Sequence, residues 1–244
     1  MRNVVVTDGS GGLGLAIVKK LAASGYRAIA IARNSGAQLS DAIANAERSD
    51  HGRIVFVSFD LAHVLGLPEL VRSLHEAFGP FHGLVNNPGA GTHRALSLMH
   101  TSKIEELVQL NTLSPIVLTK YIVRRMMADG GGRIVNVASI AACSGFSGLT
   151  VYGATKSSMI GFTRSLAREV GKMGINVNAI ASGFLDTNLT QASASDLRQA
   201  IVRRSALNRL PQVEEVAEAV EFLVSDRANS VTGSVLTVDA GTTA

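Results

Sequence analysis

The sequence predicts a doubly wound α/β domain built on a parallel sheet. Short apolar runs typical of buried strands alternate with stretches of helical periodicity along all 244 residues. Apolar residues make up 46% of the chain, enough for one large core, and no repeat, low-complexity tract or long linker divides it. We therefore expect a single domain over residues 1–244, with about seven strands and helices on both faces of the sheet.

A glycine-rich turn joins the first predicted strand to the first predicted helix. Residues 4–6 are apolar, and helical periodicity begins at residue 15. Because glycines leave the backbone uncovered, such a turn lets N–H groups at a helix N-terminus approach a pyrophosphate. Gly9, Gly11 and Gly14 have the spacing of the dinucleotide fingerprint. That spacing also fits a flexible loop, but its place between a strand and a helix favours a nucleotide site.

The second predicted strand indicates which dinucleotide is bound. Residues 28–32 form an apolar run that ends at Arg33. A site for NAD usually places Asp or Glu near this position to accept hydrogen bonds from the ribose, whereas an arginine can pair with the additional phosphate of NADP. We therefore predict NADP(H) as the cofactor; the alternative is that Arg33 is a solvated cation at a strand end.

A later predicted strand is followed directly by a serine. The apolar run over residues 134–138 is followed directly by Ser139. Open α/β sheets bind their ligands at the carboxyl ends of their strands. Ser139 is therefore placed to hold a substrate carbonyl.

Tyr152 and Lys156 share one face of a predicted helix over residues 151–170, because they are four residues apart. A neighbouring ammonium favours the phenolate, so we expect the pKa of Tyr152 to be lowered. Lowering it by about three units requires roughly 4 kcal/mol, which we expect Lys156 and a positively charged oxidised nicotinamide to supply together. Alone, these residues would be an ordinary packed pair on a helix. Together with Ser139 they can move a proton while a hydride moves elsewhere.

In their order and spacing, these motifs resemble the short-chain dehydrogenase/reductase family, which has a Rossmann-type fold. The turn over residues 7–14 is similar to the family's first motif, and Asn-Asn-Pro-Gly at residues 86–89 is similar to its Asn-Asn-Ala-Gly segment. Tyr152 follows Ser139 by thirteen positions, as it does in the family. Residues 238–241 resemble the terminal Val-Asp-Gly-Gly, so the resemblance covers nearly the whole chain.

The resemblance implies a catalytic set and a set of cofactor contacts. The catalytic residues are Asn111, Ser139, Tyr152 and Lys156, of which the asparagine connects the lysine to a chain of water in the family. The cofactor contacts come from the glycine-rich turn, from strand ends and from a loop that cups the nicotinamide. They are Asp8, Gly9, Ser10, Gly11, Leu13, Gly14, Arg33, Asp60, Leu61, Asn87, Gly89, Tyr152, Lys156, Leu185 and Thr187.

Four positions depart from the family pattern. Asp8 stands in place of the first glycine, Pro88 in place of an alanine, Ser182 in place of a proline and Ala240 in place of a glycine. The Asp8 carboxylate adds negative charge where a polyanionic cofactor should lie, which should weaken binding by about 1 to 3 kcal/mol. Pro88 lacks a backbone donor, and one lost hydrogen bond would cost about 1 kcal/mol. We expect ordinary chemistry with weakened cofactor affinity.

Within the family, the chain is most similar to the 3-oxoacyl-acyl-carrier-protein reductases. This implies NADPH-dependent reduction of a 3-oxoacyl thioester, carried by acyl carrier protein or coenzyme A, in fatty acid biosynthesis. It also implies a homotetramer. Two alternatives stay open: another carbonyl or alcohol oxidoreductase acting on a sugar, a steroid or a small ketone, and a cofactor-impaired binding protein. Substrate contacts are expected from residues 90–103, 140–151 and 184–207, the last of them a helical flap.

Composition excludes several other classes of function. The net charge of +4 is scattered and only 5% of the residues are aromatic, so nucleic acid is not an expected partner. Residues 134–155 carry no charge, but polar residues and glycines interrupt them, so we expect no membrane span. Asp8 comes too early for a signal peptide and Cys143 is the single cysteine, which favours the cytoplasm. The six histidines show no metal-binding spacing.

Overall fold

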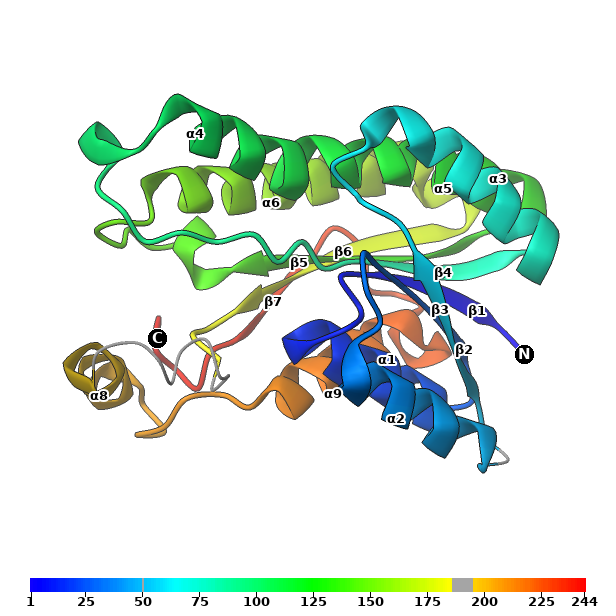
Figure 1. Cartoon of the computed structure of the whole chain (residues 1–244), viewed down its shortest axis with the longest axis horizontal. Coiled ribbons are helices and arrows are strands. Elements are labelled where there is room, and N and C mark those ends of the chain that lie inside the picture. Colours follow the sequence, from blue (N-terminus) through cyan, green and yellow to red (C-terminus); the bar gives the residue numbers. More distant parts are fainter. Residues whose placement is uncertain (50, 186–194) are drawn as a thin grey trace.

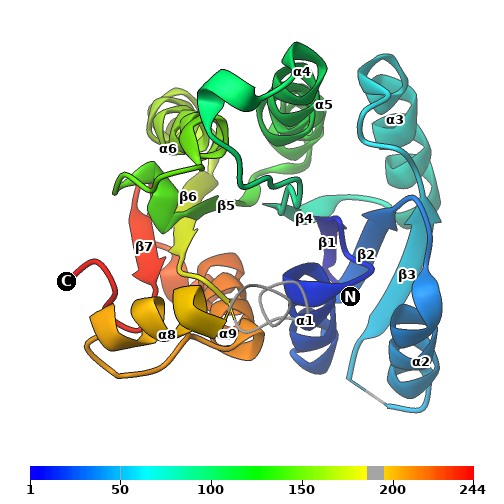
Figure 2. The same ribbon diagram turned by 60° about the vertical axis from the view of Figure 1, so that its left-hand side comes forward.

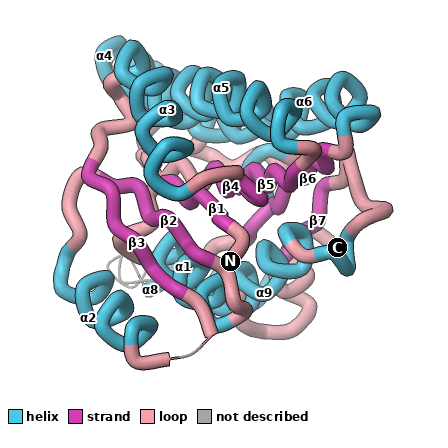
Figure 3. The backbone as a smooth tube through the Cα atoms, turned by 90° about the vertical axis from the view of Figure 1, so that its right-hand side faces the viewer, coloured by secondary structure: helices cyan, strands magenta, loops and turns pink. Residues whose placement is uncertain are grey.

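The computed structural model of the protein describes residues 1–49, 51–185 and 195–244. A seven-stranded sheet runs through it in the order β3-β2-β1-β4-β5-β6-β7, and every pair of neighbouring strands is parallel (Figure 3). The strands are β1 (Asn3–Thr7), β2 (Arg27–Ala32), β3 (Arg53–Ser58), β4 (Phe81–Asn86), β5 (Gly132–Ser139), β6 (Ile175–Ser182) and β7 (Val235–Val238). This confirms the predicted doubly wound parallel sheet.

Helices cover both faces of the sheet. In Figure 1, α3, α4, α5 and α6 form one layer, and α1, α2 and α9 form the other. The helices of the described ranges are α1 (Gly12–Ala23), α2 (Gly36–Glu47), α3 (Leu67–Phe78), α4 (Thr101–Val108), α5 (Ser114–Asp129), α6 (Thr150–Val170), α8 (Ser195–Arg204) and α9 (Val213–Val224). Helix α8 lies close to the carboxyl terminus (Figure 2).

The side chains of β1 divide between two cores, because successive residues of a strand face opposite sides of the sheet. Val4 and Val6 belong to a cluster that includes Val18 of α1 and Val220 of α9. Val5 belongs to a second cluster, formed with residues of α3, α5 and α6. All three β1 valines are fully buried, and each contributes about 1.5 to 3 kcal/mol. Burial on both faces explains why the three central positions of this strand are all apolar.

The strand order reverses at β1, which pairs with β2 on one side and with β4 on the other. Ligands of open α/β sheets bind at such a point, outside the carboxyl ends of the strands. The turn between β1 and α1 and the loop after β4 both begin here. The fold therefore brings the glycine-rich turn next to residues 87–89.

The boundaries of most elements fall close to the predicted ones. The predicted helix over residues 151–170 is α6, which starts one residue earlier at Thr150. The apolar run over residues 28–32 corresponds to β2, which starts one residue earlier at Arg27. Within the described ranges, no helix is both long and apolar enough to cross a membrane.

Candidate active site

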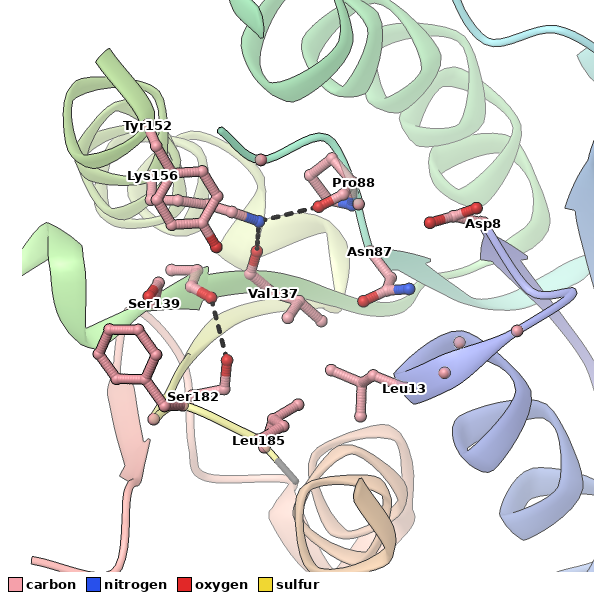
Figure 4. Close-up of a pocket in the computed structure, with 18 of the residues that line it drawn as sticks. Asp8, Leu13, Asn87, Pro88, Val137, Ser139, Tyr152, Lys156, Ser182 and Leu185 are labelled. Carbon is pink, nitrogen blue, oxygen red and sulfur yellow. Dashed lines mark hydrogen bonds between the residues drawn. The ribbon is translucent and has the colours of Figure 1, made fainter. Parts of the chain in front are cut away.

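A cavity of about 560 Å³ opens at the carboxyl ends of the central strands. The glycine-rich turn, residues 87–89 and residues 182–185 form its walls. Three of the predicted catalytic residues, Ser139, Tyr152 and Lys156, line one side, and Asp8 lies on the opposite side (Figure 4). The fold thus brings together residues from both ends of the sequence.

Lys156 is held in the wall of this cavity by two backbone carbonyls. Its Nζ donates hydrogen bonds of 3.0 Å to the carbonyl oxygens of Pro88 and Val137, and only 2% of the residue is exposed (Figure 4). Its position four residues after Tyr152 on α6 places Nζ 5.6 Å from the centroid of the tyrosine ring. Burial lowers the pKa of Lys156 to about 8, against the opposing effect of the Asp8 carboxylate.

Ser139 and Tyr152 form the second part of the site. Ser139 is the last residue of β5, and its Oγ accepts a hydrogen bond of 3.2 Å from the backbone N–H of Ala141, which caps the short turn that follows. Ser139 and Tyr152 lie on the same side of the cavity (Figure 4), and the Ser139 hydroxyl acts to lower the pKa of the phenol. Strand β5 and helix α6 therefore place the hydroxyls of Ser139 and Tyr152 on the same side of the cavity, where both can bind one carbonyl oxygen.

The pKa of Tyr152 differs from the expectation. Burial raises the pKa of the phenol, and the Ser139 hydroxyl opposes this rise only in part. Lys156 therefore does not by itself bring the pKa of Tyr152 below its ordinary value. Two N–H bonds of Lys156 go to carbonyl oxygens, and the wall of the cavity desolvates the phenol. Tyr152 is consequently a neutral proton donor.

Asn111 lies behind the cavity, in a π-helical turn over Gln109–Leu113 that joins α4 to α5. Its Nδ2 donates hydrogen bonds to the carbonyl oxygen of Ala90 at 2.8 Å and to Thr155 Oγ1 at 3.2 Å. Its Oδ1 is buried and has no hydrogen-bond partner within the described part of the chain. A buried acceptor of this kind costs about 1 to 3 kcal/mol unless water satisfies it. The orphaned oxygen fits the predicted contact with water.

A polar network below the site was not predicted from the sequence. Asn86 Nδ2 donates to Thr119 Oγ1 at 2.9 Å and to Asn136 Oδ1 at 2.8 Å. Asn136 Nδ2 in turn donates to Thr163 Oγ1 at 2.8 Å. The network joins β4 and β5 to α5 and α6, and so fixes the strands that carry residues 87–89 and Ser139. An asparagine inside the apolar run over residues 134–138 was the available signal.

The glycine-rich turn is closed by a contact that only glycine permits. A Cβ at Gly14 would lie 1.9 Å from the backbone oxygen of Asp8, so the first turn of α1 packs directly on the chain that enters it. Helix α1 has Gly11 at its N-cap and no acidic residue in its first turn. Its first N–H groups, which have no partner inside the helix, are therefore available to an anion. This backbone cradle fits a pyrophosphate.

Asp8 departs from this pattern in both conformation and charge. Its φ of 52° lies in the left-handed region, as does the φ of 55° at Ala240. Both residues stand where the family has glycine, and a side chain in this region is disfavoured. The carboxylate lies against Gly89, since a Cβ there would be 2.1 Å from Asp8 Oδ2. Desolvation in the cleft raises the pKa of Asp8, whereas Arg33 and Lys156 lower it.

A second cavity, of about 490 Å³, contains the predicted adenosine contacts. Arg33, Asp60 and Leu61 line it. Both cavities are lined by Asp8, Pro88, Gly89 and Gly91. The Asp60 carboxylate also accepts a hydrogen bond of 2.9 Å from the N–H of Ala62. The two cavities form one path with Arg33 near one end and Lys156 near the other. These residues fit a dinucleotide, and Asp8 adds a carboxylate where the two cavities meet.

The remaining predicted cofactor contacts fall in three places. Ser10, Gly11, Leu13, Gly14, Asn87, Gly89 and Leu185 line the first cavity. Gly9 lines neither cavity; it packs against β2, where a Cβ would lie 2.8 Å from the Cβ of Ala30. Thr187 lies outside the described residues.

The predicted substrate stretches meet at the mouth of the first cavity. Arg94 N donates a hydrogen bond of 2.9 Å to the carbonyl oxygen of Gly148, which joins residues 90–103 to residues 140–151. The rings of Phe146 and Phe184 are in edge contact, with centroids 5.4 Å apart. Leu149, Phe184 and Leu185 give this mouth an apolar wall. Of the predicted flap, the described part contains α8.

Ser182 ends β6 beside the site. It pairs with Ser139 across the β5–β6 ladder, and its Oγ donates a hydrogen bond of 3.5 Å to the carbonyl oxygen of Ala138. Ser182, which replaces the family's proline, therefore lies in the paired part of β6.

Comparisons with known proteins agree with this geometry. Residues 9–243 match the protein family described as Enoyl-(Acyl carrier protein) reductase. The 3-oxoacyl-[acyl-carrier-protein] reductase FabG of Escherichia coli (strain K12) is 36% identical over 238 residues, which are 97% of this chain and 95% of that protein. Acetoacetyl-CoA reductase of Allochromatium vinosum is 31% identical over 240 residues, 98% of each chain.

Solved structures are similar over almost the full length. The L-sorbose reductase of Gluconobacter frateurii, complexed with NADPH and L-sorbose, has a TM-score of 0.90 and 30% identity, covering 99% of this chain and 96% of its own. A short-chain dehydrogenase of Burkholderia cenocepacia J2315 in complex with NADP has a TM-score of 0.92 and 31% identity, covering 100% and 98%. The chain therefore belongs to the short-chain dehydrogenase/reductase family and is an NAD(P)-dependent oxidoreductase.

Proposed function

We propose that the protein reduces the keto group of a 3-oxoacyl thioester to a hydroxyl, with NADP(H) as cofactor. The observation that carries this proposal is the placement of Ser139 and Tyr152 on one wall of the cavity, beside the buried ammonium of Lys156. These groups stand at the carboxyl end of β5, in a cavity whose mouth has an apolar wall. The similarity to the 3-oxoacyl and acetoacetyl-CoA reductases supports the substrate class.

The cofactor would lie along the two connected cavities. The backbone of the glycine-rich turn would hold the pyrophosphate, and Asp60 and Leu61 would contact the adenosine. The Arg33 guanidinium favours NADP(H), because it can pair with the additional phosphate. When bound, the reduced nicotinamide supplies a hydride.

The protein's own residues handle the proton. Ser139 and Tyr152 bind the substrate carbonyl oxygen, and the phenol, which burial keeps protonated, donates its proton to that oxygen as negative charge develops. Lys156 favours the phenolate that is left, and its own pKa of about 8 allows it to return a proton near neutral pH. Asn111 Oδ1, the orphaned acceptor behind the site, would bind the water that resupplies the proton.

A panel of carbonyl compounds tests the substrate class. Initial rates with NADPH would be compared for an acetoacetyl thioester, a simple ketone, a keto sugar and a steroid. The proposal expects the thioester to have the highest kcat/KM. Equal kcat/KM for the other carbonyl compounds would reject it.

Sugar reduction is the second candidate. The observation that favours it is the similarity to L-sorbose reductase, which has the same fold over 99% of this chain. A higher kcat/KM for L-sorbose than for the thioester would establish this alternative. The family assignment argues against a non-enzymatic binding protein. Acyl carrier protein as the substrate's carrier, and assembly into a homotetramer, stay predictions.

A further inference from the structure

Asp8 and Arg33 enter one cavity from neighbouring strands. Thr7 pairs with Ile31 across β1 and β2, so the residues that follow these strands emerge at the same edge of the sheet. Both line the 490 Å³ cavity that Asp60 and Leu61 also line. The Asp8 carboxylate therefore lines the same cavity as the Arg33 guanidinium, which is proposed to bind the additional phosphate of NADP(H).

The Asp8 carboxylate is held toward this cavity by its surroundings. The backbone of Asp8 is left-handed, with φ of 52°, and the carboxylate Oδ2 rests against Gly89. Figure 4 shows the carboxylate on the far side of the cavity from Tyr152 and Lys156, near the loop that carries Asn87 and Pro88. It thus lies where the two cavities join.

The charges around Asp8 identify Arg33 as its main cationic neighbour. Burial raises the pKa of Asp8, and of the two cations that lower it Arg33 has the larger effect and Lys156 the smaller. The other charged residues of the cavity are Asp60, Lys103 and Glu106, and the last two pair with each other at 2.7 Å. Asp8 and Arg33 therefore interact across one cavity without forming an ion pair within 4.0 Å.

We propose that Asp8 sets the nucleotide selectivity of this site by competing with the adenosine 2′-phosphate for the Arg33 guanidinium. The inference rests on the proposed function, since it takes a nicotinamide dinucleotide as the ligand. NADPH and NADH share the pyrophosphate and differ in the 2′-phosphate. A carboxylate near Arg33 reduces the attraction that this guanidinium exerts on the phosphate. Asp8 therefore weakens NADPH binding much more than NADH binding. As a result, the selectivity of the site for NADPH over NADH is reduced.

Equilibrium binding measures this effect without any turnover. NADPH and NADH would each be titrated into purified protein, with nicotinamide fluorescence as the signal, because the chain contains no tryptophan. Asp8→Asn keeps the shape of the side chain and removes its charge. We expect it to lower the Kd of NADPH about tenfold and the Kd of NADH by less than about threefold. Asp8→Gly, which relieves the left-handed backbone, should give the same gain in selectivity.

Two further variants locate the effect. Asp41→Asn removes a carboxylate from a separate crevice between α1 and α2 and should leave both Kd values unchanged. Arg33→Gln should weaken NADPH binding, and in its presence Asp8→Asn should improve NADPH binding by less than about threefold, because the competition is gone.

The outcomes separate this inference from the proposed function. If the variants bind both nucleotides but Asp8→Asn leaves the ratio of the two Kd values unchanged, the inference is wrong and the proposed cofactor site stands. An equal gain for NADPH and NADH would also overturn it, since Asp8 would then act on the shared pyrophosphate. If neither wild type nor any variant binds either nucleotide at millimolar concentration, the proposed function fails and this inference fails with it.

Discussion

The ammonium of Lys156 donates a hydrogen bond of 3.0 Å to the carbonyl oxygen of Pro88, the residue that replaces the family's alanine. Proline lacks a backbone N–H but keeps its carbonyl, so this substitution preserves the acceptor that Lys156 uses. With its second bond, to Val137, Lys156 connects the loop after β4 to β5 and α6. The departure at Pro88 therefore leaves the anchoring of this lysine intact.

The burial of Lys156 should make stability depend on pH. Its pKa falls from 10.5 to about 8 in the folded protein, so between these values the unfolded chain binds more protons. The contribution of Lys156 is unfavourable below pH 8 and becomes less so as pH rises, by about 3 kcal/mol in all. We expect the free energy of unfolding of wild type, measured in urea relative to Lys156→Met, to rise from pH 8 to pH 10. If the difference in unfolding free energy between wild type and Lys156→Met stays constant or falls over this pH range, the lowered pKa of Lys156 is refuted. Lys172→Met, which replaces an exposed lysine, is the control.

Gly14 should tolerate no side chain, whereas Gly11 should accept one. A Cβ at Gly14 would meet the Asp8 backbone oxygen at 1.9 Å, but a Cβ at Gly11 meets nothing within 4 Å. Because the obstacle at Gly14 is backbone, relief requires movement of the whole turn. We expect Gly14→Ala to cost at least about 2 kcal/mol of unfolding free energy and to abolish nucleotide binding. Gly11→Ala is the matched control, and equal stability of the two variants would contradict the close approach.

Removal of Asn136 should weaken the support of the site. In Asn136→Ala, Asn86 and Thr163 each lose a partner inside the protein. Leaving buried polar groups unpaired should lower the unfolding free energy by about 2 to 4 kcal/mol. Thermal and urea unfolding would measure this loss, with Asn45→Ala on exposed α2 as the comparison. A loss below about 1 kcal/mol would show that water replaces the missing amide.

The aromatic contact at the cavity mouth should affect substrate more than cofactor. Phe184 lines the cavity and its ring meets Phe146. We expect Phe184→Ala to raise KM for an acyl thioester about tenfold by removing apolar contact area, with the Kd of NADPH changed by less than about twofold. Steady-state kinetics gives the KM for the thioester, and fluorescence titration gives the Kd of NADPH. An unchanged KM would place the acyl chain elsewhere.

Sequence patterns predicted the sheet because its central strands are buried on both faces and therefore carry runs of apolar residues. Spacing on a helix placed Tyr152 and Lys156 together, and a strand end placed Ser139, since both depend on local geometry. The rise that burial causes in the pKa of Tyr152 was not predicted, because the degree of burial and the hydrogen-bond partners of Lys156 depend on the tertiary fold.

The features that sequence reasoning missed all join distant segments. Asn86 and Asn136 are fifty positions apart, and no local pattern indicates that their amides meet. The carbonyl partners of Lys156 come from two other elements and carry no sequence signature, since every residue has a carbonyl. The left-handed backbone at Asp8 and Ala240 was signalled only by the glycines that the family has there.

The most direct test of the proposed reaction compares wild type with Tyr152→Phe, using NADPH and an acetoacetyl thioester. The variant removes the proton donor and keeps the ring beside Lys156. We expect kcat to fall about 100-fold to 10,000-fold while NADPH binding, followed by nicotinamide fluorescence, changes by less than about threefold. Turnover by wild type with this loss in the variant is the predicted result. Undiminished reduction by Tyr152→Phe, or no turnover by wild type despite bound NADPH, would contradict the account.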